Sequence, residues 1–263
     1  MAITAKDVQA LRQSTGVGMM DAKKALEANN GDMEASVQWL RVQGLAKAAQ
    51  RADREAGEGA VAVVRNGNVA AIVELRCETD FVAKSDEFVA LVDEMAARVC
   101  AEGEGATAQF QEQIEKMLTT LKENISIGRV YRLEAGEGEV VETYIHQQAG
   151  RGVNAVIVVL KNGSEETAHE ICVHIAFAKP SFLSRDEVPQ SEVDAERKTV
   201  EEISRNEGKP EAALPKIIEG RLNGWFKERV LVEQSYVKDE KQTIAQFLGG
   251  ASIRAYAQVV IGG

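Results

Sequence analysis

"GAVAVVRNGNVAAIVELRC", residues 59–77, is the stretch of the sequence that decides the fold. Two runs rich in Val, Ala and Ile show the period-two pattern of β-strands, and Asn66-Gly67 lies between them. Asn-Gly favours a hairpin with a type I′ turn, because that turn needs positive φ at both central residues. The stretch therefore predicts a pair of antiparallel strands joined by a type I′ turn.

The same plan is repeated further along the chain. "VNAVIVVL" (153–160) resembles "VAAIVEL" (69–75), and each run leads into an amphipathic helical pattern, at 165–178 and at 86–101. A further helix is expected at about 107–125, and "RVYRLEAGEGEVVETYIHQ" (129–147) is typical of strand, turn, strand. The pattern predicts a duplicated α+β unit.

The N-terminal region has a different, helical texture. Thr4 and Asp7 mark the start of a first helix over 4–13, a second is expected over 19–31, and Asp32 can cap a third over 32–44. Residues 44–58 are rich in Ala and charge without an apolar stripe, which indicates a helical or mobile linker. The region is predicted to be a three-helix module followed by that linker.

A helical hairpin is expected between the second helical pattern and the C-terminus. Gly208 can end its first arm, and Pro210 fits the first turn of the second arm. The second arm carries a full apolar stripe, but the first offers only Val193, Val200 and Ile203. Such a thin seam predicts a hairpin that protrudes into solvent, and a helix at 241–250 and a strand at 252–263 are expected after it.

Charge and composition exclude several classes of protein. The net charge is −10, and the mildly basic part is confined to residues 1–54, with eight Lys/Arg against six Asp/Glu. Binding to a phosphate backbone needs clustered positive charge, so nucleic acid is a poor partner. The odd, scattered cysteines predict no disulfide framework, and no secretion signal or membrane span is apparent. The protein is expected to be soluble and cytoplasmic.

Motifs for chemistry are missing from the sequence. It contains no GxxxxGK[ST] and no GxSxG, and isolated Gly-x-Gly pairs are weak signals. His169 and His174 are five residues apart, roughly 140° around a helix, so they do not match a zinc-binding HExxH. For His174, a half-buried structural role is favoured over metal binding. We expect no cofactor, no metal and no enzymatic activity.

The segment "RCETDFVAKSDEF" (76–88) joins the predicted strand to the next helix. Thr79 or Asp80 can cap a first helical turn, and Ser85 or Asp86 can cap the helix that follows. Phe81 falls between these caps. Local sequence alone favours a side chain that packs as a staple over one that contacts a partner.

Four segments now carry a resemblance that covers essentially the whole chain. "STGVGMMDAKKALEANNGDMEASVQWLRVQG", "CETDFVAKSDEF", "VHIAFAKPSFL" and "GKPEAALPKIIEGRLNGWF" occur in the order and at the separations of bacterial translation elongation factor Ts. The chain resembles that family. The resemblance implies an α+β fold with a ubiquitin-associated-like three-helix module (1–54), followed by two similar subdomains with antiparallel sheets. These are 55–140 and 141–263, the second carrying a protruding hairpin at 187–228.

The resemblance also implies a function and contact residues. It implies a guanine-nucleotide exchange factor for the GTPase elongation factor Tu, which disturbs the magnesium and phosphate site of Tu without binding nucleotide itself. The residues that it places against Tu are Leu11, Met19, Met20, Thr79, Asp80, Phe81, Val82 and His146. Leu11 is as readily a core residue, whereas adjacent Met19 and Met20 cannot both point inward. For Phe81 the resemblance reverses the preference that the local sequence gives, and implies that the side chain contacts Tu and does not pack as a staple.

Two departures from the family pattern concern the second subdomain. After His146 this chain reads "QQAGRGVNAVIVV", where the family commonly has a tighter glycine-rich turn. Better-known members continue into a helical module after the final strand, whereas this sequence ends at "VVIGG". We expect the contact made by that module to be absent or replaced. Competing functions are a nucleic-acid or ubiquitin-type binder built on the N-terminal helices, or an enzyme that uses scattered carboxylates and His146.

Overall fold

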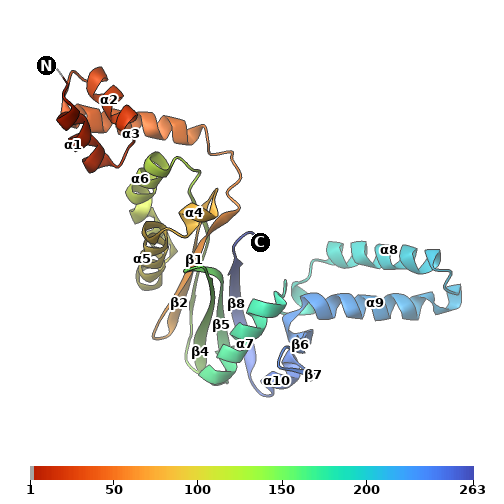
Figure 1. Cartoon of the computed structure of the whole chain (residues 1–263). Coiled ribbons are helices and arrows are strands. Elements are labelled where there is room, and N and C mark those ends of the chain that lie inside the picture. Colours follow the sequence, from red (N-terminus) through yellow and green to blue (C-terminus); the bar gives the residue numbers. More distant parts are fainter. Residues whose placement is uncertain (1–2) are drawn as a thin grey trace.

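Three helices at the N-terminus form a small unit in the computed structural model, which describes residues 3–263 (Figure 1). They are α1 (Ala5–Thr15), α2 (Met19–Ala28) and α3 (Met33–Ala49). This confirms the predicted three-helix module, apart from residues 1 and 2, which lie outside the described residues.

The predicted caps hold the first and third helices. The Thr4 side chain accepts from the Asp7 amide at 3.3 Å, and the Asp7 carboxylate accepts from the Thr4 amide at 2.9 Å, which forms a capping box. Asp32 accepts from the Ala35 amide at 2.9 Å. The apolar faces meet in a core of Val8, Leu11, Val17, Ala22, Ala25, Leu26 and Leu40.

Helix α3 extends beyond its predicted end and packs against α6 (Gln111–Leu121). The close approach depends on Gly44, since a Cβ there would lie 2.5 Å from the Thr119 methyl. Arg41 pairs with Glu115 at 3.0 Å across the same contact. The N-terminal module is therefore attached to the α+β part of the chain through α6.

The first sheet has the antiparallel order β1-β2-β3, with β1 at Glu58–Asn66, β2 at Val69–Cys77 and β3 at Ser126–Glu134. The predicted hairpin is present, but the predicted turn type is wrong. Asn66 pairs with Val69, so the central residues are Gly67 and Asn68, and of these two only Gly67 has a positive φ, at 60°. That pattern fits a type II′ turn. Asn66 ends the strand, and the side-chain amide of Asn68 donates to Ala135 O at 3.0 Å.

Helices cover the outer face of this sheet. They are α5 (Asp86–Glu102), the 3₁₀ helix η1 (Glu104–Phe110) and α6. The helix predicted over 107–125 thus begins as a 3₁₀ helix and ends earlier, because Lys122 has a left-handed φ of 61° and turns the chain back toward the sheet.

The second sheet repeats the arrangement of the first. Its order is β4-β5-β8, with β4 at Glu139–Gln148, β5 at Arg151–Lys161 and β8 at Ser252–Val260. In each sheet the central strand leads to a helix on the outer face, and here that helix is α7 (Glu165–Ala178). The predicted α+β duplication is confirmed. The strand–turn–strand of 129–147 is also present, but its turn carries the chain from the first sheet to the second.

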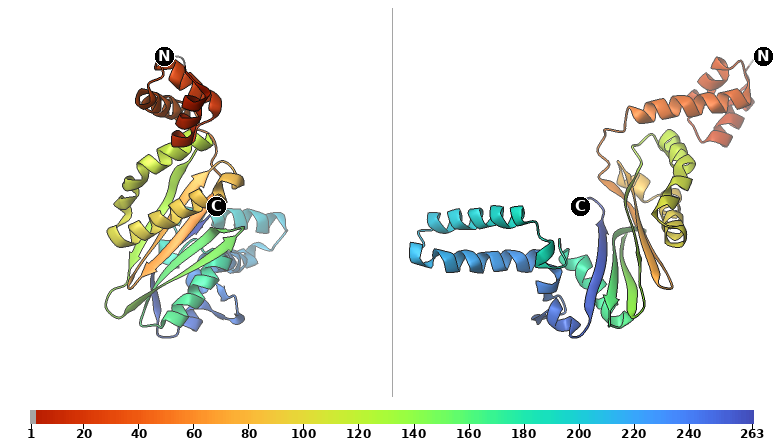
Figure 2. Two further views of the ribbon diagram at one scale, coloured as in Figure 1. Left: turned by 60° about the vertical axis from the view of Figure 1, so that its left-hand side comes forward. Right: turned by 180° about the vertical axis from the view of Figure 1, so that it is seen from behind.

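The two sheets pack face to face between their helices (Figures 1 and 2). Alternate residues of β2 explain this layering: Ala71, Val73 and Leu75 face the helices, whereas Ala70 and Ile72 join the core between the sheets. That core consists of Val61, Ala70, Ile72, Ala135, Val141, Ala155, Ile157, Val159, Ala257 and Val259. Burial on both faces explains why the central strands read as nearly continuous apolar runs.

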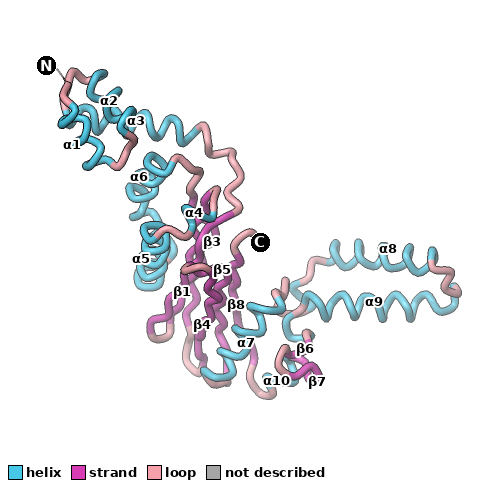
Figure 3. The backbone as a smooth tube through the Cα atoms, viewed as in Figure 1, coloured by secondary structure: helices cyan, strands magenta, loops and turns pink. Residues whose placement is uncertain are grey.

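A helical hairpin projects from the second subdomain, as predicted (Figures 2 and 3). Its arms are α8 (Gln190–Asn206) and α9 (Leu214–Arg229). Gly208, at φ 71°, ends the first arm in a Schellman motif, in which the Lys209 amide donates to Ser204 O at 3.1 Å. The seam is thin, with Val200 meeting Leu214, Ile218 and Leu222.

Short elements around the hairpin differ from prediction. Pro210 precedes a 3₁₀ turn, and Pro215 occupies the first turn of α9 instead. The helix predicted at 241–250 is shorter, because its first residues pair in a small two-stranded sheet. The remaining elements are η2 (Arg185–Glu187), η3 (Glu211–Ala213), η4 (Leu231–Glu233), β6 (Ser235–Tyr236), β7 (Asp239–Thr243) and α10 (Ile244–Leu248).

Candidate partner-binding site

Phe81 is the most exposed of the large apolar side chains named here, with 84% of its surface open to solvent. It lies in the single helical turn α4 (Asp80–Ala83), between β2 and α5. Val82 and Ala83 pack into the core of the first subdomain, so the turn is anchored on one side while Phe81 extends from the other. The staple favoured by local sequence is not formed. We call residues 79–84 the Phe81 turn.

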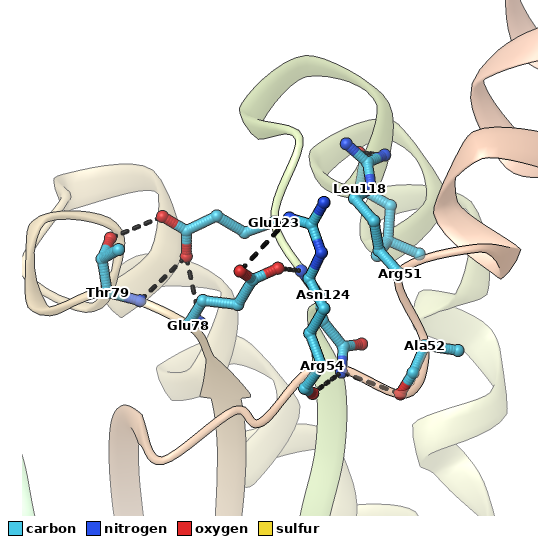
Figure 4. Close-up of polar contacts among 8 residues, drawn as sticks. All are labelled: Arg51, Ala52, Arg54, Glu78, Thr79, Leu118, Glu123 and Asn124. Atoms are coloured by element: carbon cyan, nitrogen blue, oxygen red, sulfur yellow. Dashed lines mark hydrogen bonds and ion pairs between the residues drawn. The ribbon is translucent and has the colours of Figure 1, made fainter.

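The start of this turn is held by one carboxylate from the loop after α6 (Figure 4). Glu123 accepts from the backbone amides of Glu78 and Thr79, each at 3.0 Å, and from the Thr79 hydroxyl at 2.5 Å. Thr79 in turn accepts from the Val82 amide at 3.4 Å as the N-cap of α4. Thr79 and Val82 therefore hold the turn on the side opposite Phe81.

The same loop connects the turn to the chain that leaves the N-terminal module (Figure 4). The Asn124 amide donates to Glu78 Oε1 at 2.6 Å, and its side chain donates to Ala52 O and Arg54 O at 3.1 and 2.8 Å. Arg54 pairs with Glu78 at 3.4 Å. Sequence reasoning missed Glu123 and Asn124, because their partners are more than 40 positions away in sequence.

Removing the Glu123 carboxylate is expected to loosen the Phe81 turn. Glu123→Ala leaves three donors without their acceptor, so we expect a loss of about 1–3 kcal/mol in the free energy of unfolding and faster hydrogen exchange at the Glu78 and Thr79 amides. Urea unfolding and amide exchange measure these effects. Glu112→Ala, at an exposed position in α6, is the control, and equal exchange rates in both variants would contradict the assignment.

Two further groups surround the Phe81 turn. Asp80 pairs with Lys84 at 2.5 Å, and this hydrogen bond lowers the pKa of the Asp80 carboxyl, which keeps it ionised near neutral pH. The Cys77 thiol donates to Thr79 O at 3.2 Å, and burial raises its pKa to about 12. The turn thus presents an exposed ring beside a carboxylate.

The N-terminal candidates divide between surface and core. Met19 and Met20, in the first turn of α2, are 47% and 63% exposed. Leu11, by contrast, is 0% exposed in the free chain, because α1 turns its side chain into the three-helix core. Val42 is also exposed, which sequence periodicity did not indicate.

His146 is exposed near the end of β4, at a bulge between His146 and Gln147. It pairs with Asn154, whose side chain donates to Ala176 O at 2.8 Å, so His146 lies beside the last turn of α7. The turn that follows has positive φ at Ala149 (52°) and Gly150 (82°), the type I′ pattern. The exposed Phe177 in the same last turn of α7 was missed by sequence reasoning.

The other histidine of interest is structural. His174 is fully buried, not half-buried as predicted, and its Nδ1 accepts from the Val237 amide at 3.3 Å. Its Nε2 is 3.0 Å from Gln234 Oε1, and burial lowers the pKa of the ring, which favours the neutral form. Within residues 3–263, no group of three His, Cys, Asp or Glu is placed to hold a metal ion.

Two further features concern the helices of the part of the chain that the structure describes. None of its helices is long and apolar enough to cross a membrane. A groove of about 350 Å³ lies between the N-terminal module and α6, and its lining residues include Thr15, Arg41 and Glu115. Phe81 on its braced turn, two exposed methionines on a separate module and an exposed histidine at a strand end are the candidate contact points of this scaffold.

Comparison with known proteins gives this scaffold a family. The family described as Elongation factor TS matches residues 78–262. The relative named Elongation factor Ts from Clavibacter michiganensis subsp. michiganensis is 45% identical over 98% of this chain and 98% of its own length. Those from Leifsonia xyli subsp. xyli and Kineococcus radiotolerans are 44% and 40% identical, over 99% and 96% of this chain and 99% and 95% of their own lengths. The chain belongs to the elongation factor Ts family and is a translation elongation factor.

Proposed function

We propose that this chain is a cytoplasmic exchange factor that binds elongation factor Tu carrying GDP and accelerates release of the nucleotide, so that GTP can load. The observation that carries the proposal is the exposure of Phe81 on a turn braced by Glu123. An apolar ring held in water has no stabilising role in the free chain, and it suits insertion into an apolar recess of a partner. The chain itself binds neither nucleotide nor nucleic acid.

Insertion of such a ring is sufficient to accelerate nucleotide release, because of how a GTPase holds its nucleotide. A GTPase holds its nucleotide mainly through phosphate contacts and a Mg²⁺ ion that demands near-ideal octahedral geometry. Small displacements of the surrounding backbone by Phe81 and Asp80 therefore weaken nucleotide binding strongly. By linkage, the factor and the nucleotide weaken each other equally, and a 10⁴-fold effect corresponds to about 5.5 kcal/mol of coupling. No covalent step is needed.

The remaining contacts anchor the factor at a distance from that site. Met19 and Met20 lie on α2 of the N-terminal module, at one end of the elongated molecule (Figure 2), and His146 lies near the end of β4 in the second subdomain. We assign Met19 and Met20 to the GTPase domain of Tu and His146 to its third domain. Thr79 and Val82 act by holding the turn.

A release assay tests the proposal directly. Tu loaded with fluorescent GDP is mixed with a substoichiometric amount of this chain and an excess of unlabelled GDP, and the fluorescence decay is followed. We expect multiple turnovers at a rate well above spontaneous release. A decay that equals the buffer control would refute the proposed function.

A further inference from the structure

Arg151, the first residue of β5, is buried to more than nine-tenths of its surface, with 8% exposed. Its guanidinium reaches from the second subdomain to the first. Nη1 donates to Gly59 O at 2.6 Å and Nη2 donates to Glu58 Oε2 at 2.8 Å, both at the start of β1. One side chain therefore connects an end of each sheet.

The candidate contact residues Phe81 and His146 lie next to these two sheet ends. On one side, the tight turn at Ala149-Gly150 joins Arg151 to the strand end of His146. On the other side, Glu58 is the register partner of Cys77, which leads into the Phe81 turn. The positive charge of Arg151 also contributes, after the hydrogen bond from Lys84, to lowering the pKa of Asp80.

Backbone contact closes the same junction. A Cβ at Gly152 would lie 2.1 Å from Val61 O and 2.6 Å from the Ile145 side chain, so β5 and β1 approach here as closely as glycine allows. The guanidinium thus lies at the rim of a tight contact between the sheets, where a small shift moves both strand ends relative to each other.

Stability does not explain a buried arginine at this place. Its carboxylate partner Glu58 is only half-buried, with 42% of its side chain open to solvent, and Arg151 Nε has no hydrogen-bond partner among the described residues. Burying a charge with incomplete pairing contributes little net stability, and an apolar side chain of similar volume often serves as well. Two donors at fixed angles do, however, specify the relative placement of the groups that they join.

We propose that Arg151 is a positioning residue that fixes the distance between the Phe81 turn and the strand end of His146, so that both engage one partner simultaneously. The consequence for exchange rests on the proposed function. The placement itself is a property of the free chain and can be measured without a partner.

The first experiment measures that placement. Spin labels are attached to Phe81→Cys and Gln148→Cys, both exposed positions in a chain whose own cysteines are buried. We expect a narrow distance distribution with Arg151 present and a broad or shifted one in Arg151→Met, with partial recovery in Arg151→Lys, which keeps the charge but not the fork. A distribution that Arg151→Met leaves unchanged would overturn the proposal.

The second experiment measures exchange in the unlabelled chain with Phe81 intact. Arg151→Met is expected to lower kcat/KM for GDP release about tenfold, since misplacement by about 1 Å can cost up to 10²-fold, while Tm changes little. The matched control is Arg254→Met, because Arg254 also joins the two sheets, through Glu134 O, but at their other end. Equal losses in the two variants would overturn the positioning role. If the unmutated chain shows no exchange while the spin-label distances still broaden in Arg151→Met, the placement stands and the proposed function fails.

Discussion

Phe81→Ala is expected to lower kcat/KM for GDP release at least about 30-fold, and to change the free energy of unfolding by less than about 0.5 kcal/mol. The two effects separate because the ring is 84% exposed and contributes almost nothing to the core of the free chain. A central aromatic contact with a partner is worth about 2 kcal/mol or more, and each 1.4 kcal/mol corresponds to a factor of ten. Release assays and urea unfolding measure the two quantities.

The matched control is another phenylalanine of the same segment with the opposite burial. Phe88 is fully buried in the core of the first subdomain, seven positions after Phe81. Phe88→Leu is expected to cost about 1 kcal/mol of stability and to leave exchange per folded molecule unchanged. A Phe81→Ala variant that loses stability like a core variant, or that exchanges nucleotide normally, would remove Phe81 from the site.

Arg129→Met is expected to destabilise the fold by about 3–5 kcal/mol. Glu74 is buried at a bulge in β2, and Arg129 donates to its two carboxylate oxygens at 2.8 and 2.9 Å. Burial raises the pKa of Glu74, but hydrogen bonds from Arg129 and Arg76 outweigh it and lower the pKa to about 2. Without Arg129, most of this compensation is lost and a charge remains buried.

The same ion pair predicts how stability depends on pH. The pKa of Glu74 is lower in the folded chain, at about 2, than the ordinary value of 4.5. The contribution of the ionised Glu74 carboxylate to the free energy of unfolding is therefore complete above about pH 5, and it is lost as the pH falls from about 4.5 toward 2. The shift corresponds to about 3 kcal/mol, so urea titrations should show a decline in this window that is reduced in Glu74→Gln.

Arg132 provides the control for Arg129. It lies on the same strand and pairs at 3.3 Å with Glu134, which is exposed. Arg132→Met should cost less than about 1 kcal/mol, because the carboxylate that it leaves behind is solvated. Adding Glu74→Gln to Arg129→Met should recover part of the lost stability. Equal effects of Arg129→Met and Arg132→Met would show that the Glu74 pair is unimportant.

Sequence patterns predicted the elements of the fold well where local chemistry sets them. Thr4, Asp7 and Asp32 act as caps as expected, and Gly208 ends α8. The errors lie where a distant residue decides. The Asn68 side chain, inside the type II′ turn, donates to Ala135 O, and Lys122 ends α6 early so that Glu123 reaches Thr79. The candidate site shows the same contrast between local and distant effects. Motif resemblance pointed to Phe81 and His146, but not to Glu123, Asn124 or Arg151, whose roles depend on distant contacts.

By itself the sequence determined the identity of the long strands and helices, the duplication, and the membership of Phe81 in a matching motif, because periodicity, caps and motifs are local properties. The tertiary structure alone decided that Phe81 faces solvent while Leu11 does not, and that one carboxylate and one guanidinium hold the ends of both sheets in place. These contacts join residues 44 to 93 positions apart. Their formation depends on how the sheets pack and not on any pattern along the chain.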